Sequence, residues 1–399
     1  MAFNLHKLFL SPYLILISFN AAFAISEYLQ VYILASIPLI IFFLLNILSN
    51  ELPKNFFQVI DIPIIFFSIN NIFLLIIYPS LGALNYFFVY LYTFVLIYFS
   101  IKYYLLKIGW KSFIQIANIG LYFVIFFVIF NFIFYRITGT NLQVFIPRIG
   151  PSADSVTFQG FLMRAYGFSN EPTNLSSYFL SFGILAIFFN SKYNKNFVFP
   201  LLAILLFAAL LSYSSGFFIS ICIAFFVVLI YLLIDTFLFF KIKKKNVLYA
   251  FLLTAVIAQI FIFIPEIFRK ILVFEQFMFS RGNLWVNIWS SIVDNNFSPN
   301  GLSSAPPVVN WYLMLLYENG LISLLLIFTF ILLLINKVRK SNLSKNDKLF
   351  FYFGIVAIFF QINSFSNFYY PFYLIYSLVI SNIVDFYNKV KLKPIKFEE

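Results

Sequence analysis

Long apolar runs recur along this chain, and they limit its possible folds more than any other feature. A nearly uncharged run of about 17 to 25 residues can cross a bilayer as a helix. We expect about twelve such spans, near residues 8–24, 30–48, 58–78, 85–101, 112–135, 173–190, 197–213, 216–240, 247–265, 311–335, 350–364 and 368–386. Hydrophobic residues form 63% of the chain and charged residues 10%, whereas soluble domains are about 45–50% apolar.

The predicted fold class is an all-α polytopic integral membrane protein, with residues 1–399 forming one membrane domain. Two segments between spans are long, residues 136–172 and 266–310, and loops of this length are usually functional or disordered. Both are rich in aromatic residues, which argues against disorder. We expect two outer loops, periplasmic or extracellular, that contain short amphipathic helices. The first span ends in "AAFA" and resembles a signal peptide, but its length favours an uncleaved helix.

The distribution of lysine and arginine predicts the orientation in the membrane, because cytoplasmic segments collect basic residues. With the N-terminus inside, 20 of the 26 basic residues fall on the cytoplasmic side, so both termini are expected in the cytoplasm. The net charge of +12 is then a topology signal, and no nucleic-acid partner is expected. The outer side keeps Arg136, Arg148, Arg164, Arg269, Lys270 and Arg281.

The basic residues expected outside differ in type from those expected inside. Five of the six outer basic residues are arginine, whereas Arg339 is the one arginine among those inside. A topology signal accepts either residue, but the guanidinium is a planar fork that binds phosphate or carboxylate through two bonds. The outer arginines therefore favour an anion site. The alternative is that they extend to the lipid headgroups.

The first outer loop contains "MRAYGFSNEPTN", residues 163–174, preceded by Arg148 and Asp154. Gly160 and Gly167 permit tight turns, and Pro172 suits the first turn of the next helix. Arg164 and Glu171 are candidate catalytic residues, with Arg148 and Asp154 in substrate binding. The alternative for Glu171 is that it only complements the positive end of that helix.

The second outer loop contains "SRGNLWVNIWSSI", in which apolar residues recur at helical spacing. Trp285 and its neighbours predict an amphipathic helix on the membrane surface or over a cavity. Arg281 precedes this helix, and an anion held near a helix start is a common arrangement. We count Arg281 among the candidate catalytic residues and Arg269 and Trp285 among the substrate-binding ones. The alternative is a helix that tryptophans merely anchor at the interface.

Glu318 falls inside the expected span 311–335, about two turns from the outer surface at 1.5 Å per residue. A carboxylate within a span is costly and indicates function by default, so Glu318 is a candidate catalytic residue. Gly320 beside it offers a structural alternative, close approach of another helix. Asp61, Asp235 and Asp385 lie near cytoplasmic ends of spans, where no special role is expected.

Other chemistry has little support in the sequence. His6, the only histidine, lies at the expected cytoplasmic N-terminus, and the outer loops have no paired aspartates for a hard metal. We expect neither a metal nor another cofactor. Cys222 is the only cysteine, so it has no partner for a disulfide within the chain.

Three stretches stand out in the layout of spans and loops. The first outer loop ends in "RAYGFSNEP", the second contains "SRGNLWVNIW", and the span after the second begins with "NWYLMLLYENGLISLLL". This layout resembles the O-antigen polymerase and ligase superfamily, in particular Wzy-type repeat-unit polymerases. The first motif of that family matches Arg164, Gly167, Glu171 and Pro172. The second matches Arg281 and Trp285, and the third matches Gly301, Asn310, Glu318 and Gly320. Ligases of this superfamily carry histidine just before the matching asparagine; Val309 here disfavours a ligase.

The resemblance implies a metal-independent glycosyltransferase on the outer face of a bacterial plasma membrane. Such enzymes move a growing glycan from undecaprenyl pyrophosphate to a lipid-linked repeat unit, for O-antigen, capsule or exopolysaccharide. Arg164 and Arg281 would bind the pyrophosphate with support from Arg148 and Arg269, since the leaving group is an anion. Glu171 is the first candidate for the base, and Glu318 and Asp154 are the reserves.

The resemblance also implies an undecaprenyl-pyrophosphate-linked oligosaccharide and the lipid bilayer as partners, allows a chain-length regulator protein, and makes Asn310 a substrate-binding candidate. Two other classes remain open. A flippase for lipid-linked oligosaccharides would carry polar residues along its spans and repeat symmetry between its halves. A polytopic scaffold without chemistry would have no use for arginine-rich outer loops.

Overall fold

The computed structural model describes residues 5–19, 23, 30–146, 158–159, 162–163, 165–169, 171–212, 214–239, 283–306, 310–364 and 371–392. These residues are helical apart from their connections and one short ladder, in which β1 (Phe158–Gln159) pairs antiparallel with β2 (Leu162–Met163). The predicted all-helical class is therefore confirmed. Of the expected spans, 247–265 lies outside the described residues, 8–24 extends past the end of α1 at Leu16, and the described residues of the others lie mainly on helix.

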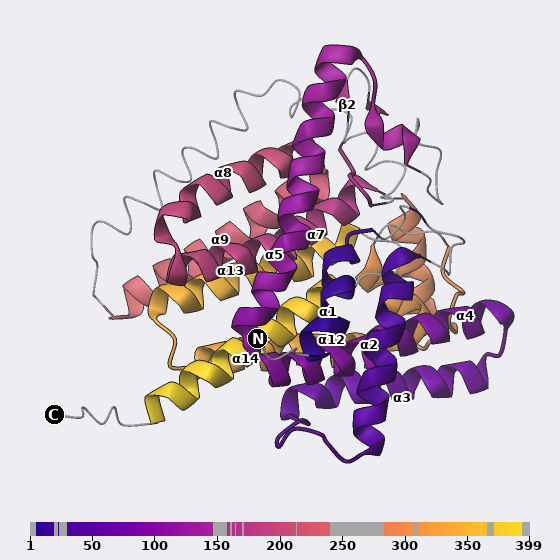
Figure 1. Cartoon of the computed structure of the whole chain (residues 1–399). Coiled ribbons are helices and arrows are strands. Elements are labelled where there is room, and N and C mark those ends of the chain that lie inside the picture. The colour runs from indigo at the N-terminus through magenta and orange to yellow at the C-terminus, as the bar shows by residue number, and fades with distance from the viewer. Residues whose placement is uncertain are drawn as a thin grey trace.

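The N-terminal half contains a series of helices that Figure 1 draws in indigo and purple. In chain order they are α1 (Leu5–Leu16), α2 (Val31–Leu48), the 3-10 turn η1 (Val59–Asp61), α3 (Ile62–Ile77), α4 (Leu81–Tyr90), the π-helical stretch η2 (Leu91–Ile97), α5 (Tyr98–Thr138) and the 3-10 turn η3 (Leu142–Phe145). The expected spans 85–101 and 112–135 belong to one helical run, 81–138, that bends at Gly109 (φ 76°, ψ 157°).

The C-terminal half contains α7 (Pro172–Tyr193), α8 (Lys195–Leu211), α9 (Ser215–Phe239), a helical stretch at 283–294, α12 (Trp311–Arg339), α13 (Lys345–Gln361), the 3-10 turn η4 (Ile362–Ser364) and α14 (Phe372–Leu392). Pro172 occupies the first turn of α7, as predicted. Among the closest helix pairs, α13 packs against α9, α1 against α5 and α2, and α12 against α3.

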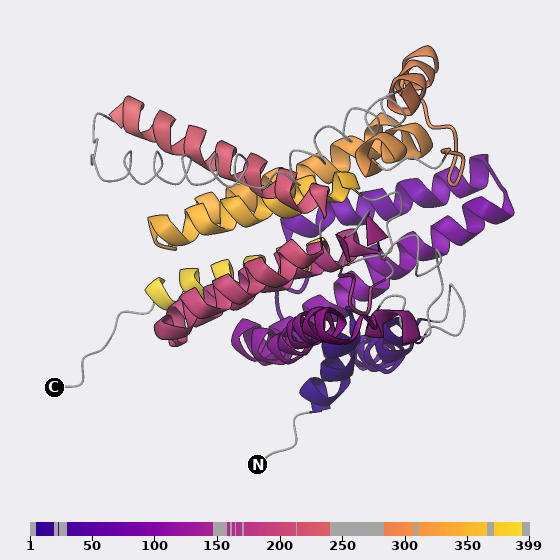
Figure 2. The same cartoon turned by 90° about the horizontal axis from the view of Figure 1, so that it is seen from above.

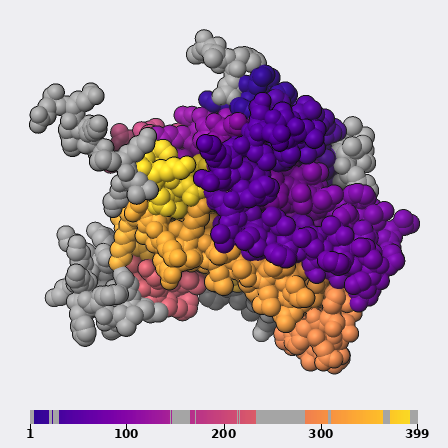
Figure 3. Space-filling view, turned by 90° about the horizontal axis from the view of Figure 1, so that it is seen from below, coloured from indigo at the N-terminus to yellow at the C-terminus, as the bar shows by residue number. Residues whose placement is uncertain are grey.

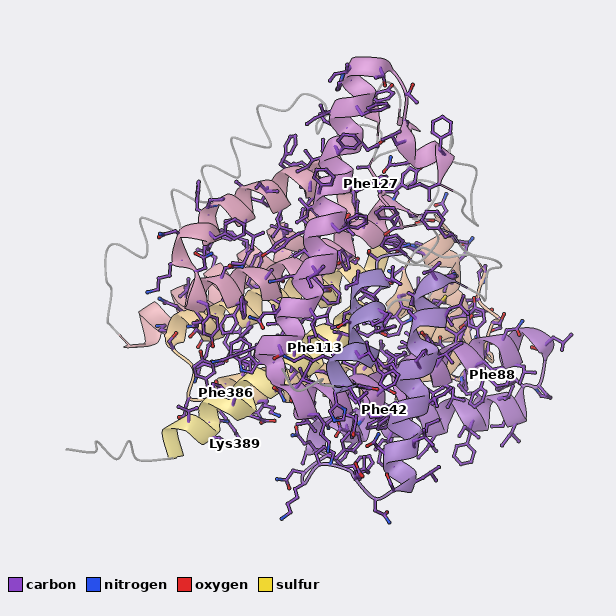
Figure 4. All side chains as sticks on the ribbon, in the orientation of Figure 1. Phe42, Phe88, Phe113, Phe127, Phe386 and Lys389 are labelled. Atoms are coloured by element: carbon purple, nitrogen blue, oxygen red, sulfur yellow. The ribbon has the colours of Figure 1, made fainter. Side chains whose placement is uncertain are left out.

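Five helical stretches among the described residues are long and apolar enough to cross a membrane: Val31–Leu48, Val59–Ile77, Leu81–Thr138, Pro172–Tyr193 and Trp311–Arg339. Large apolar side chains also face outward along the helices, such as Phe88, labelled in Figure 4, which is 55% exposed. Such surfaces favour a lipid environment over water. The fold is compatible with a membrane-embedded protein.

The sequence predicts no special role for Asp61 at the end of a span, but the structure gives it one. It is fully buried, and Lys102 (4% exposed) forms an ion pair with it. The Tyr98 hydroxyl donates to its Oδ1 at 2.8 Å, and the Gln58 backbone N–H donates to its Oδ2 at 2.6 Å. Lys102, expected as a cytoplasmic topology signal, is thus a core residue that joins α5 to η1.

A second ion pair adjoins this one through the Gln58 side chain. Lys337 of α12 donates to Gln58 Oε1 at 2.8 Å and to Asp385 Oδ2 at 2.9 Å, and Gln58 Nε2 donates to the same aspartate at 3.0 Å. We call Gln58, Asp61, Tyr98, Lys102, Lys337 and Asp385 the Asp61 network. It connects η1, α5, α12 and α14 through hydrogen bonds in which at least one partner is charged, and such bonds are stronger than those between neutral groups.

Candidate functional site

The candidate residues divide into those that the structure describes and those that it does not. Glu171, Trp285, Asn310 and Glu318 are described; Arg148, Asp154, Arg164, Arg269, Arg281 and Val309 lie outside the described residues. The described candidates belong to two segments, 165–172 and 283–320. Figures 1 and 2 place both segments at the same end of the helices, opposite the end that holds the lysine-rich turn between α12 and α13.

Segment 165–169, which follows Arg164, is fixed by its backbone. The Ala165 N–H donates to the carbonyl of Leu211 at the end of α8, at 2.8 Å. The N–H groups of Tyr166 and Gly167 both donate to Gln143 Oε1, at 2.8 Å and 2.7 Å. Gly167 has φ +56°, so the tight turn predicted for this glycine is confirmed.

Gln143 is in turn held by amide side chains that sequence reasoning missed. Asn131, within α5, donates to Asn141 Oδ1 at 3.1 Å, and that same oxygen accepts the Gln143 N–H at 3.1 Å. All three side chains are buried. The signal in the sequence is Asn131 within the apolar run "VIFNFIF", since a buried amide in such a run needs a polar partner.

Aromatic stacking anchors the same segment to the N-terminal helices. The Phe168 ring stacks on Phe19 at 4.1 Å and on Phe127 at 4.3 Å between ring centroids. Phe127, labelled in Figure 4, extends from α5. Backbone hydrogen bonds and stacked rings therefore hold residues 165–169 from several sides.

Glu171 lies at the N-cap of α7, yet its carboxylate makes no capping hydrogen bond. Its backbone carbonyl accepts from Asn174 and Leu175, at 3.1 Å and 3.3 Å. The side chain is exposed and forms no ion pair with any residue that the structure describes. Its position still lets it interact with the helix dipole, but the carboxylate is open to a ligand.

The predicted amphipathic helix is present at residues 283–294. Ile288 and Ile292 are buried against Leu316 of α12, with the partly buried Trp285 packed beside them. Trp289, on the other face, is 50% exposed. The helix therefore covers the first turns of α12 and presents its remaining aromatic surface outward.

The expected span 311–335 lies within α12, but the helix breaks at Gly320 (φ 76°, ψ 179°) and is not continuous. The loop after residue 294 enters the break. Asn300 and Gly301 donate their backbone N–H groups to the carbonyls of Tyr317 and Glu318, at 3.0 Å and 3.1 Å. These bonds satisfy carbonyls that lose their helical donors when the helix stops. Gly320 thus admits a loop, whereas the structural alternative from the sequence is close approach of another helix.

The side chain of Glu318 points into that loop. It is 1% exposed, and its Oε1 accepts the Ala305 N–H at 3.2 Å. Its other oxygen, Oε2, has no hydrogen-bond partner among the described residues. Glu318 is therefore far less accessible than Glu171, and no hydrogen bond or ion pair joins these two described residues.

Asn310 caps α12, with its Oδ1 accepting the Leu313 N–H at 3.1 Å. Its role in substrate binding stays a prediction. Within the described ranges, no three or more histidine, cysteine, aspartate or glutamate residues are grouped as a metal site would require.

The chain was compared with protein-family models, curated proteins and solved structures, and nothing in any of these three comparisons matches it.

Proposed function

We propose that this chain is a multi-pass protein of a bacterial plasma (inner) membrane, with about twelve spans and both termini in the cytoplasm. The loops 136–172 and 266–310 then face the outside. The clustering of lysine in alternate connections supports this orientation. Figure 2 is consistent with this orientation, because the 283–294 helix and the turn between α3 and α4 lie at the same end of the helices, away from the turn between α12 and α13.

The proposed activity is polymerisation of polysaccharide repeat units for O-antigen, capsule or exopolysaccharide. A sugar hydroxyl of a new lipid-linked repeat unit attacks the anomeric carbon of the growing glycan. The bond from that carbon to undecaprenyl pyrophosphate breaks, and a glycosidic bond forms. The hydroxyl proton passes to a carboxylate, and undecaprenyl pyrophosphate leaves as an anion.

Each chemical task is assigned to a residue type suited to it. Arg164 and Arg281 bind the pyrophosphate and stabilise its developing charge, with Arg148 and Arg269 in support. Glu171 is the proposed base, because its carboxylate is exposed and unpaired among the described residues while Glu318 is buried. Asp154, Trp285 and Asn310 are proposed to contact the sugars.

One observation carries the proposal: Glu171 presents an exposed carboxylate seven residues after Arg164, next to a segment that is otherwise fixed. A base must be held within hydrogen-bond reach of its substrate, and rigid support favours this. A loop that only connected two spans would have no need for the buried contacts of residues 165–169.

The test is the length of surface polysaccharide in cells that lack the protein, complemented with wild type, Arg164→Ala, Arg281→Ala or Glu171→Gln. The proposal predicts single repeat units in the null strain and in each variant, at normal protein level. Arg136→Ala is the matched control. Arg136 lies in the last turn of α5, at the start of the first outer loop, and its guanidinium packs on Phe132 at 5.2 Å from the ring centroid. Cells with Arg136→Ala should still make long chains. Long chains in the null strain would contradict the proposal.

A flippase for lipid-linked oligosaccharides is the second candidate, and the broken α12 favours it. Interrupted helices with polar side chains at the break are common in transporters. Here the buried Asn319 donates to Asn71 Oδ1 of α3 at 2.6 Å. The same strains separate the two functions: without a flippase, no repeat unit reaches the surface, whereas without a polymerase single units still appear.

A further inference from the structure

The loop after the 283–294 helix contacts α12 at its break through several residues. Phe297 is bound to Leu321, whose N–H donates to the Phe297 carbonyl at 3.3 Å. A Cβ on Gly320 would lie 3.0 Å from the Pro299 ring. Together with the bonds from Asn300 and Gly301, this seats residues 297–305 in the break. We call these residues the seated loop.

The seated loop holds a conformation that it would not adopt alone. Phe297, Gly301 and Ser303 all have positive φ, at 59°, 97° and 63°. For residues other than glycine this is unfavourable and persists only where surrounding contacts enforce it. A Cβ on Gly301 would lie 2.7 Å from Tyr78 Cβ, so the loop is also pressed against the end of α3.

Figure 3 shows this packing from below, where the orange atoms around residue 300 lie beside the purple of α3 and α4. The loop is therefore clamped between two helices, and the 283–294 helix precedes it directly in the chain. Any shift of the loop moves that helix relative to Leu316, on which Ile288 and Ile292 rest.

Glu318 supplies the side-chain part of the clamp. Its Oε1 accepts the backbone N–H of Ala305 at 3.2 Å, which makes it the side chain that holds the loop over the break. At 1% exposure it has no open path to a sugar hydroxyl in this arrangement. A buried carboxylate is costly, and such a residue is retained for what it holds or for what it reacts with.

We infer that Glu318 is a positioning residue: by holding the seated loop it fixes the 283–294 helix over α12. The last step, in which this placement serves polymerisation, rests on the proposed function. The placement itself is a property of the fold and can be measured without any activity.

The experiment measures how exposed a thiol at position 292 becomes in purified protein in detergent. Cys222 is first replaced by alanine, and Ile292→Cys then introduces the thiol at a site that is 1% exposed. A charged maleimide reports its exposure. Ser291→Cys, at the neighbouring exposed position, is the control that should react at the same rate in every background.

Glu318→Ala removes the oxygen that accepts the Ala305 N–H, so labelling of the thiol at position 292 should become about tenfold faster or more. Glu318→Gln keeps the accepting oxygen, so this thiol should stay protected. Because Oε2 has no partner among the described residues, its replacement by an amide breaks no hydrogen bond to any of them. A thiol that stays protected in Glu318→Ala would overturn the inference.

Polymerisation in cells separates this inference from the proposed function. Positioning predicts long chains with Glu318→Gln and short ones with Glu318→Ala. If Glu318→Gln loses polymerisation while the thiol at position 292 stays protected, Glu318 acts through its charge or proton, and the positioning role is wrong. If wild type makes no polymer but Glu318→Ala still exposes that thiol, the proposed function fails while the positioning of the helix stands.

Discussion

Replacing Lys102 with methionine removes the positive charge opposite Asp61 and changes side-chain volume little. Asp61 would keep the Tyr98 hydroxyl and the Gln58 N–H as donors, but it would remain a fully buried carboxylate without a counter-charge. Breaking a buried ion pair in this way typically costs about 3–5 kcal/mol. We expect Lys102→Met to lower the free energy of unfolding by an amount in this range.

The double variant Asp61→Asn/Lys102→Met removes both charges. Because a buried pair replaced as a whole is close to neutral in stability, the double variant should regain at least half of the loss. The control is Lys192→Met at the ion pair with Asp347, whose side chains are 29% and 13% exposed. That change should lower the free energy of unfolding by less than Lys102→Met does, about 1 kcal/mol, because the pair with Asp347 is only partly buried.

The assay is reversible unfolding of the purified protein in mixed detergent micelles. Wild type, Asp61→Asn, Lys102→Met and the double variant form a cycle that isolates the interaction between Asp61 and Lys102. The reasoning is refuted if Lys102→Met is no more destabilising than Lys192→Met, or if the double variant is as unstable as Lys102→Met. Either result would mean that the Asp61 charge is solvated without Lys102.

Three further predictions concern the candidate site. Gly320→Ala should lower the free energy of unfolding by about 3 kcal/mol, because the added Cβ meets Pro299 at a residue with positive φ. Gly139→Ala, with φ +72° but open space around the added Cβ, should lower it by about 1 kcal/mol. Unfolding in detergent measures both, and equal losses would contradict the role of the seated loop. Gln143→Ala removes the acceptor of two backbone N–H groups and should lower the free energy of unfolding by about 2 kcal/mol; a harmless alanine would show that segment 165–169 is held by other means. Phe168→Ala removes the ring stacked on Phe19 and Phe127 and should make a cysteine placed at Ser169 more reactive to maleimide by about tenfold; unchanged reactivity would argue against stacking as an anchor.

The sequence predicts the helices well because an apolar run long enough to cross a bilayer is a local feature. The first turn of α7 at Pro172 and the buried face of the 283–294 helix are local too, and both are confirmed. The expected span 8–24 is too long, since α1 ends at Leu16 and residues 17–18 form a turn. Ends of helices depend on what packs around them, which an apolar run does not reveal.

What the sequence could not predict depends on partners far along the chain. The pair between Asp61 and Lys102 joins residues on η1 and α5, and a lysine near a span end is equally typical of a topology signal. The break at Gly320 exists because residues 297–305 supply donors to Tyr317 and Glu318. Nothing within the run "LLYENGLISLLL" reveals that a loop fits there, since glycine alone also occurs in continuous spans.

The central claim is best tested with purified protein in vesicles that contain an undecaprenyl-pyrophosphate-linked repeat unit and no other enzyme. The account predicts longer lipid-linked glycans together with release of undecaprenyl pyrophosphate, and loss of both with Arg164→Ala but not with Arg136→Ala. Intact repeat units that only move from one leaflet to the other would contradict it and identify the chain as a transporter.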